Sequence, residues 1–137
     1  MSRIGKVVIE ADGGSRGNPG PAGYGAVVLD ADGQELLDRS GFLGVTTNNV
    51  AEYRGLIAGL AAARELGAVH AEVRMDSRLV VEQMSGNWKV RHPGLKPLAA
   101  EALALVGEFE SVSFHWVPRA ENLRADALAN QAMDDGR

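Results

Sequence analysis

Short apolar runs rich in β-branched residues dominate the first third of the chain, and they predict β-strands bounded by turn residues. One such run covers residues 3–11 and stops at a block of glycines, and another covers 23–30. Asp32-Gly33 is typical of a hairpin turn, and a third strand is predicted over 34–43. Strands joined by such short connections predict an antiparallel meander.

The apolar spacing becomes helical in the next segment. Apolar residues at 50, 53, 56, 57, 60 and 63 predict a helix from Asn49 to Leu66, which Gly67 ends. The rest of the chain predicts, in order, a strand over 70–75, a helix over 77–84, a loop over 85–93, a helix over 95–108 with Pro97 in its first turn, a strand over 111–117 and a helix over 123–133.

This order of elements predicts an α/β fold. The first half supplies antiparallel strands, and the second half supplies strand–helix crossovers, which require parallel strands. One mixed five-stranded sheet with helices on both faces satisfies both requirements. Ligands of such sheets bind outside the carboxyl ends of the parallel strands.

Four carboxylates fall at positions that this topology brings to one end of the sheet. Asp12 closes the first predicted strand, Asp76 follows the fourth, and Glu52 and Asp126 lie in the first turns of two helices. Carboxylates that meet without a cation raise each other's pKa values. Oxygen ligands without histidine or cysteine suit Mg²⁺ or Mn²⁺, and two such ions form the clamp used in phosphodiester cleavage.

Each of these positions also has a structural explanation. Asp76 precedes a helix as an N-cap does, Asn49 and Glu52 have capping-box spacing, and Asp126 suits the positive end of a helix. The glycine-rich stretch after Asp12 is explained either by a tight turn or by the close approach of a charged ligand to bare backbone.

Composition narrows the class of protein. The 137 residues are 45% hydrophobic and 23% charged, which is ordinary for one globular domain covering 1–137. The chain has no cysteine, no signal peptide and no apolar run long enough to span a bilayer, so we expect a cytoplasmic protein without membrane association. The net charge of -4 requires any nucleic-acid binding to use a local basic patch.

Four segments in order, DGGSRGNPGPAGYG, TTNNVAEYRGLIAGL, MDSRLVVEQMSG and WVPRAENLRADALAN, resemble ribonuclease H type I over nearly the whole chain. The resemblance implies a ribonuclease H-like fold and a metal-dependent endonuclease that cuts the RNA strand of RNA–DNA hybrids, leaving 3′-hydroxyl and 5′-phosphate ends. It implies two Mg²⁺ ions per site, with Mn²⁺ as a substitute, and the metal-binding catalytic residues Asp12, Glu52, Asp76 and Asp126.

The resemblance also implies a set of substrate-binding residues. Gly13 and Gly14 would let the substrate backbone approach, and Thr47 matches a position that binds a phosphate of the DNA strand. Minor-groove contacts, including ribose 2′-hydroxyls, are implied for Asn18, Asn48 and Asn49. An amide both donates to and accepts from a 2′-hydroxyl, which suits this role, although capping by Asn48 and Asn49 is an alternative explanation.

The stretch GNWKVRHPGLK contains Trp88, Lys89 and Arg91, with His92 and Lys96, and an aromatic ring among cations is typical of a grip on a sugar–phosphate strand. The alternative is a solvated loop with Trp88 in the core. Longer relatives carry a basic helical insertion here that this chain lacks. Many also carry a histidine before the last acidic residue, where this chain has PRAENLRA (118–125), and Arg119, Glu121 and Asn122 are the candidates to take its place.

Two other functions stay open. One is a nuclease of the same fold that also cuts double-stranded RNA, since both duplexes present a shallow minor groove. The other is a non-catalytic module that only binds hybrids. Similar domains occur alone or fused to another enzyme domain, so a longer chain is a further expectation.

Overall fold

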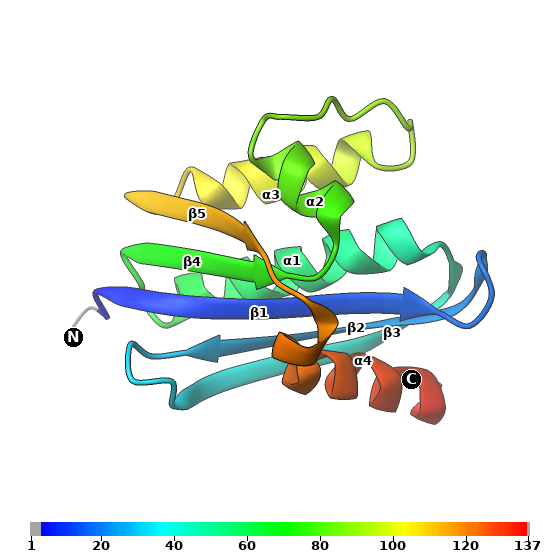
Figure 1. Ribbon diagram of the computed structural model, residues 1–137, viewed down its shortest axis with the longest axis horizontal. Coiled ribbons are helices and arrows are strands. Elements are labelled where there is room, and N and C mark those ends of the chain that lie inside the picture. Colours follow the sequence, from blue (N-terminus) through cyan, green and yellow to red (C-terminus); the bar gives the residue numbers. More distant parts are fainter. Residues whose placement is uncertain (1–3, 137) are drawn as a thin grey trace.

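The structure is a computed structural model and describes residues 4–136, in which the strands and helices follow the predicted order (Figure 1). The strands are β1 (Lys6–Ser15), β2 (Gly20–Leu29), β3 (Glu35–Thr46), β4 (His70–Met75) and β5 (Ser111–Trp116). The helices are α1 (Asn48–Glu65), α2 (Arg78–Met84), α3 (Lys96–Val106) and α4 (Leu123–Asp135), with a 3-10 turn at Arg119–Glu121 that was not predicted.

The five strands form one mixed sheet in the order β3-β2-β1-β4-β5, which confirms the predicted fold class. β2 is antiparallel to both β1 and β3, whereas β4 is parallel to β1 and β5 is parallel to β4. The arrowheads of β1, β4 and β5 therefore point the same way (Figure 1). Their carboxyl ends define the end of the sheet where a ligand is expected.

The prediction that Asp12 closes the first strand is wrong. The parallel pairing of β1 with β4 ends at Glu10, opposite Arg74, but β1 continues to Ser15 along β2, with Asp12 opposite Gly25. β2 supplies the hydrogen bonds that keep this glycine-rich continuation extended. Asp12 therefore lies beyond the last parallel pair while its own backbone is still held in the sheet.

Helices cover both faces of the sheet, as predicted. α1, α2 and α3 share the large hydrophobic core with the buried sides of β1 and β4, including Val7, Ile9 and Val73. α4 packs across β1, β2 and β3 on the opposite face, where it lies in front of the sheet in Figure 1. None of the helices within residues 4–136 is long and apolar enough to cross a membrane.

Two glycines allow α1 to touch β1 main chain to main chain. A Cβ added to Gly13 would lie 2.2 Å from the carbonyl carbon of Ala51, and one added to Gly55 would lie 2.5 Å from the carbonyl oxygen of Asp12. Real Cβ atoms do not approach so closely, so both positions require glycine. The sequence interpretation of Gly13 as room for a ligand is therefore incomplete, because the space beside it is filled by α1.

Candidate active site

Four elements present the predicted carboxylates to one pocket. Asp12 comes from β1, Asp76 is the first residue after β4, Glu52 comes from α1 and Asp126 from the first turn of α4. All four line a pocket of about 350 Å³ at the carboxyl ends of the parallel strands, together with Gly13, Gly14, Ser15, Asn48, Arg119 and Met133. The topology predicted from the sequence is thus sufficient to bring these side chains together.

Three of the four carboxylates form a compact group. Asp12, Glu52 and Asp76 each offer one oxygen atom, and these atoms all lie within 4.8 Å of one another. Asp126 lies in the same pocket but outside that group, and its carboxylate is 3.3 Å from the guanidinium group of Arg119. The acidic site therefore consists of a close triad and one adjacent carboxylate that already has a cationic partner.

The electrostatics of the triad favour the binding of a cation. Burial, then the charge of Asp76 and a hydrogen bond with Asp126, raises the pKa of Asp12 to about 8. Burial, followed by repulsion from Asp12 and Asp76, also raises the pKa of Glu52 well above its usual range. Oε2 of Glu52 is buried without any hydrogen-bond partner. A divalent cation fits this all-oxygen donor set, because it would neutralise the charges and occupy the orphaned oxygen.

The capping explanations for Glu52 and Asp76 are wrong. Thr47 is the N-cap of α1, and its hydroxyl oxygen accepts a hydrogen bond from Val50, so Glu52 lies in the second turn and caps nothing. Ser77 similarly caps α2 through Val80, which leaves the Asp76 side chain free of that task.

Asn122 is a functional candidate that no local sequence pattern distinguishes from its neighbours. Its side chain is fully buried, and its Nδ2 donates both to the carbonyl oxygen of Ala11 (2.8 Å) and to the Asp76 carboxylate (3.1 Å). Its Oδ1 is buried without a partner. One amide thus links β1, next to Asp12, to the carboxylate that follows β4, a contact that no local pattern could show.

Of the three residues considered for the missing histidine, Arg119 is the one that reaches the pocket beside Asp126 with a largely exposed side chain. Glu121 is exposed, and the side chain of Asn122 instead donates a hydrogen bond to the carboxylate of Asp76. His115 is exposed on β5 and bonds to the Ser113 hydroxyl (3.0 Å). Strand alternation places it on the open side of the sheet, away from the core.

The three asparagines lie together beside the carboxylates. The backbone N–H of Asn48 donates to Oδ1 of Asn18 (3.1 Å), and Oδ1 of Asn48 accepts from both the backbone and the hydroxyl of Ser15. Asn48 and Asn49 do not cap α1, since Thr47 does. A second pocket beside the first is lined by Asn18, Thr47, Asn49, His92 and Leu95. The structure therefore joins residues 18, 47 and 49 to the loop that precedes α3.

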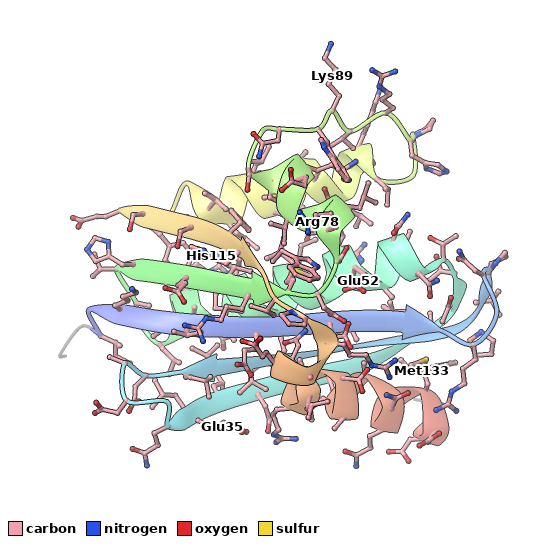
Figure 2. All side chains as sticks on the ribbon, in the orientation of Figure 1. Glu35, Glu52, Arg78, Lys89, His115 and Met133 are labelled. Atoms are coloured by element: carbon pink, nitrogen blue, oxygen red, sulfur yellow. The ribbon has the colours of Figure 1, made fainter. Side chains whose placement is uncertain are left out.

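The loop between α2 and α3 is exposed and contains no helical insertion. Trp88 is 46% exposed, so the alternative that placed it in the core is wrong. Lys89 and Arg91 are also exposed, and Figure 2 shows Lys89 pointing away from the molecule.

A mixed sheet of this order with acidic residues at its parallel end defines the ribonuclease H-like class of folds. Residues 10–132 match the reverse transcriptase-like family, which agrees with that class. A ribonuclease HI of Halobacterium salinarum is 46% identical over 133 residues, which cover 97% of this chain and 67% of that protein. The chain belongs to the ribonuclease H family.

A bifunctional protein of Mycobacterium tuberculosis is 65% identical over 130 residues, which cover 94% of this chain and 36% of that protein. The chain thus spans about a third of the length of that mycobacterial relative. Among solved structures, the N-terminal RNase H domain of a Mycobacterium tuberculosis protein, fused to maltose-binding protein, has a TM-score of 0.94 at 63% identity, covering 96% of this chain and 95% of that one. LC11-RNase H1 in complex with an RNA/DNA hybrid has a TM-score of 0.90 at 44% identity, covering 94% and 97%.

Proposed function

We propose that this chain is a metal-dependent endonuclease that hydrolyses the RNA strand of RNA–DNA hybrids to 3′-hydroxyl and 5′-phosphate ends. The observation that carries the proposal is the triad of Asp12, Glu52 and Asp76, with one oxygen from each within 4.8 Å of the others. The similarity to LC11-RNase H1, whose structure contains an RNA/DNA hybrid, supports the choice of substrate.

The triad and Asp126 would hold two Mg²⁺ ions, with Mn²⁺ as a substitute. When bound, such ions would neutralise the carboxylates and make a water molecule easier to deprotonate. Asn122 keeps the Asp76 carboxylate turned toward Ala11 and thus toward β1. Arg119, beside Asp126, offers its exposed guanidinium group to a phosphate that enters or leaves the pocket.

The remaining predicted residues would recognise the duplex. Asn18, Asn48 and Asn49 would contact ribose 2′-hydroxyls, and Thr47 would bind a phosphate of the DNA strand. A Cβ on Gly14 would meet only the end of the Met133 side chain at 3.5 Å, so the backbone at Gly14 has room for the substrate. The exposed residues Trp88, Lys89 and Arg91 would bind the sugar–phosphate backbone.

The direct experiment incubates purified protein with end-labelled duplexes of one sequence: an RNA–DNA hybrid, double-stranded RNA and double-stranded DNA. Each is tested with Mg²⁺, with Mn²⁺ and with EDTA. We expect cleavage of the hybrid RNA strand only with a divalent ion, and no cleavage by Asp76→Asn, which removes a charge and little volume. Equal cleavage of double-stranded RNA would favour the broader nuclease. Binding without cleavage under every condition would favour the non-catalytic module.

Strand choice has its own test. Replacing Asn18, Asn48 or Asn49 by alanine should weaken binding or slow cleavage by roughly 1–3 kcal/mol, the range expected when a polar partner is left unpaired. These variants should lose affinity for the hybrid and not for a duplex of DNA alone. Equal cleavage of double-stranded DNA by the unmodified protein would contradict the assigned role.

The cytoplasmic location stays a prediction. The matched residues cover 36% of the bifunctional mycobacterial relative. The length of that relative supports the expectation that such a domain is joined to a second enzyme domain in a longer chain.

A further inference from the structure

The cations of this protein are distributed unevenly between paired and unpaired positions. Outside residues 78–96, every lysine and arginine that the structure describes lies 3.4 Å or less from a carboxylate. That segment contains four cations, Arg78, Lys89, Arg91 and Lys96. None of them forms an ion pair with any residue of 4–136. The unpaired positive charge of an acidic protein is therefore concentrated in one segment.

Arg78 differs from the other three in its place along the chain, since Lys89 and Arg91 lie in the loop and Lys96 begins α3. Arg78 is the first residue of α2 and follows Asp76 by two positions, so its backbone is fixed next to the acidic triad. In the projection of Figure 2, Arg78 lies between Lys89 and Glu52.

The Arg78 side chain rests on an exposed tryptophan. Its guanidinium carbon is 4.7 Å from the ring centroid of Trp116, the last residue of β5. The indole Nε1 of Trp116 donates a hydrogen bond to the backbone carbonyl oxygen of Asp76 (3.2 Å), yet the residue is 43% exposed. The hydrogen bond fixes the ring on the turn between β4 and α2, and the ring in turn restricts where the guanidinium group can lie.

A stacked guanidinium group keeps its in-plane N–H donors available for a ligand, and their fork geometry matches the oxygens of a phosphate. A phosphate entering a pocket lined by four carboxylates is repelled by them, so a fixed cation at the rim would lower that barrier. Among the described residues, Arg78 meets both conditions, since it is unpaired and immobilised close to Asp76.

We propose that Arg78 binds a backbone phosphate of the substrate next to the cleaved position, and that Trp116 is the positioning residue that holds it there. This assignment rests on the proposed function, since the phosphate is that of a nucleic-acid strand passing the carboxylate site. The competing explanation is that the pair only stabilises the end of β5.

Salt dependence separates the two explanations. Each phosphate contact contributes about 0.9 to the slope of log affinity against log salt, so its loss should reduce the rise in Kd between 50 and 200 mM salt by about three- to fourfold. Binding of a labelled hybrid in EDTA, measured by fluorescence anisotropy, should show this reduction for Arg78→Ala and a smaller one for Arg78→Lys. Arg64→Ala is the matched control, because Arg64 is paired with Glu108 at the far end of α1. Equal salt slopes for Arg78→Ala and Arg64→Ala would overturn the proposal.

Trp116 provides a second readout. The chain has two tryptophans, so Trp88→Phe leaves Trp116 as the sole indole fluorophore. Its emission should change when hybrid is added, and the change should be lost when Arg78→Ala is combined with Trp88→Phe. Trp116→Phe keeps an aromatic ring but removes the Nε1 donor, and it should raise KM about threefold or more with little change in kcat.

Constant Trp116 emission on saturation with hybrid, or an unchanged KM in Trp116→Phe, would leave only the structural explanation. If the unmodified protein neither binds nor cleaves the hybrid, the proposed function itself fails. If the unmodified protein binds and cleaves the hybrid, but the Arg78 and Trp116 variants behave as the Arg64→Ala control does, the proposed function stands and only the Arg78–phosphate contact is wrong.

Discussion

Replacing Asp12 by asparagine should make the metal-free protein more stable at pH 8. Burial and the neighbouring Asp76 raise the pKa of Asp12 from 3.8 to about 8. Between these two values the folded state holds a proton that the unfolded state releases, so the free energy of unfolding falls as the pH rises from about 4 to about 8. An asparagine carries no such penalty, and the variant should lose most of this decline.

The size of the effect follows from the pKa difference. About four pKa units at 1.36 kcal/mol each give a ceiling of about 6 kcal/mol at pH 8. For a domain of this length, each kcal/mol corresponds to about 3–4 °C in Tm. A hydrogen bond from Arg124 lowers the pKa of Glu35. Glu35 therefore reduces the free energy of unfolding as the pH falls below about 4.5, so its contribution and that of Asp12 occupy different pH ranges.

Thermal and urea unfolding in EDTA, at intervals from pH 4 to pH 8.5, measure this directly. Asp12→Asn should be at least about 1 kcal/mol more stable than the unmodified protein at pH 8 and close to it at pH 4. Asp135→Asn, on an exposed position of α4, is the control and should follow the unmodified protein throughout. Adding Mg²⁺ should stabilise the unmodified protein and not Asp12→Asn. A flat pH profile in EDTA, or a destabilised Asp12→Asn at pH 8, would refute the charge-repulsion account of the site.

Three further predictions concern Asn122, the cations of the loop between α2 and α3, and the histidines. Asn122→Ala removes two hydrogen bonds of a buried side chain, so the free energy of unfolding should fall by about 2–4 kcal/mol and calorimetry should show a weaker affinity for Mn²⁺. Asn122→Leu should regain stability without regaining that affinity, and normal Mn²⁺ binding by both variants would contradict the positioning role of Asn122. Replacing Lys89 and Arg91 together by alanine should raise KM more than it lowers kcat and reduce the salt slope by roughly one unit per phosphate contact, whereas an unchanged slope would make the segment an ordinary solvated loop. Replacing all three histidines should leave the single-turnover rate and its pH profile largely intact, and a loss of about a hundredfold would instead identify one of them as a general acid or base.

The sequence predicted the element order and the sheet because each element has its own local signal. Apolar spacing marks α1, and the run from His70 to Met75 matches β4 residue for residue. The position of Asp76 at a parallel strand end was therefore predictable. Local signals failed where a partner far along the chain decides the conformation. Gly13 and Gly14 suggest a turn by themselves, yet they remain in β1 because β2 pairs with them.

The acidic residues of the site were predictable from the sequence, whereas the contacts that hold these residues in place were less so. Glu52 has the spacing of a capping box with Asn49, but the helix begins one residue earlier because Thr47 supplies the cap. Asn122 bonds to Ala11, more than a hundred residues away, and nothing in its local sequence indicates that contact. Such contacts exist only after the fold is complete.

The direct contact of β1 with α1 has a consequence for how this protein can change over evolution. Gly13 and Gly55 let the two main chains meet without an intervening side chain, so this contact sets how closely the backbones of Asp12 and Glu52 approach. Leu56 and Leu60 take no part in this main-chain contact, so exchanging them, by drift or by engineering for heat resistance, should disturb the spacing of these two acids less than a change at either glycine. A single methyl group added at position 13 or 55 would separate them, even though neither glycine has a side chain that could bind a metal or a substrate.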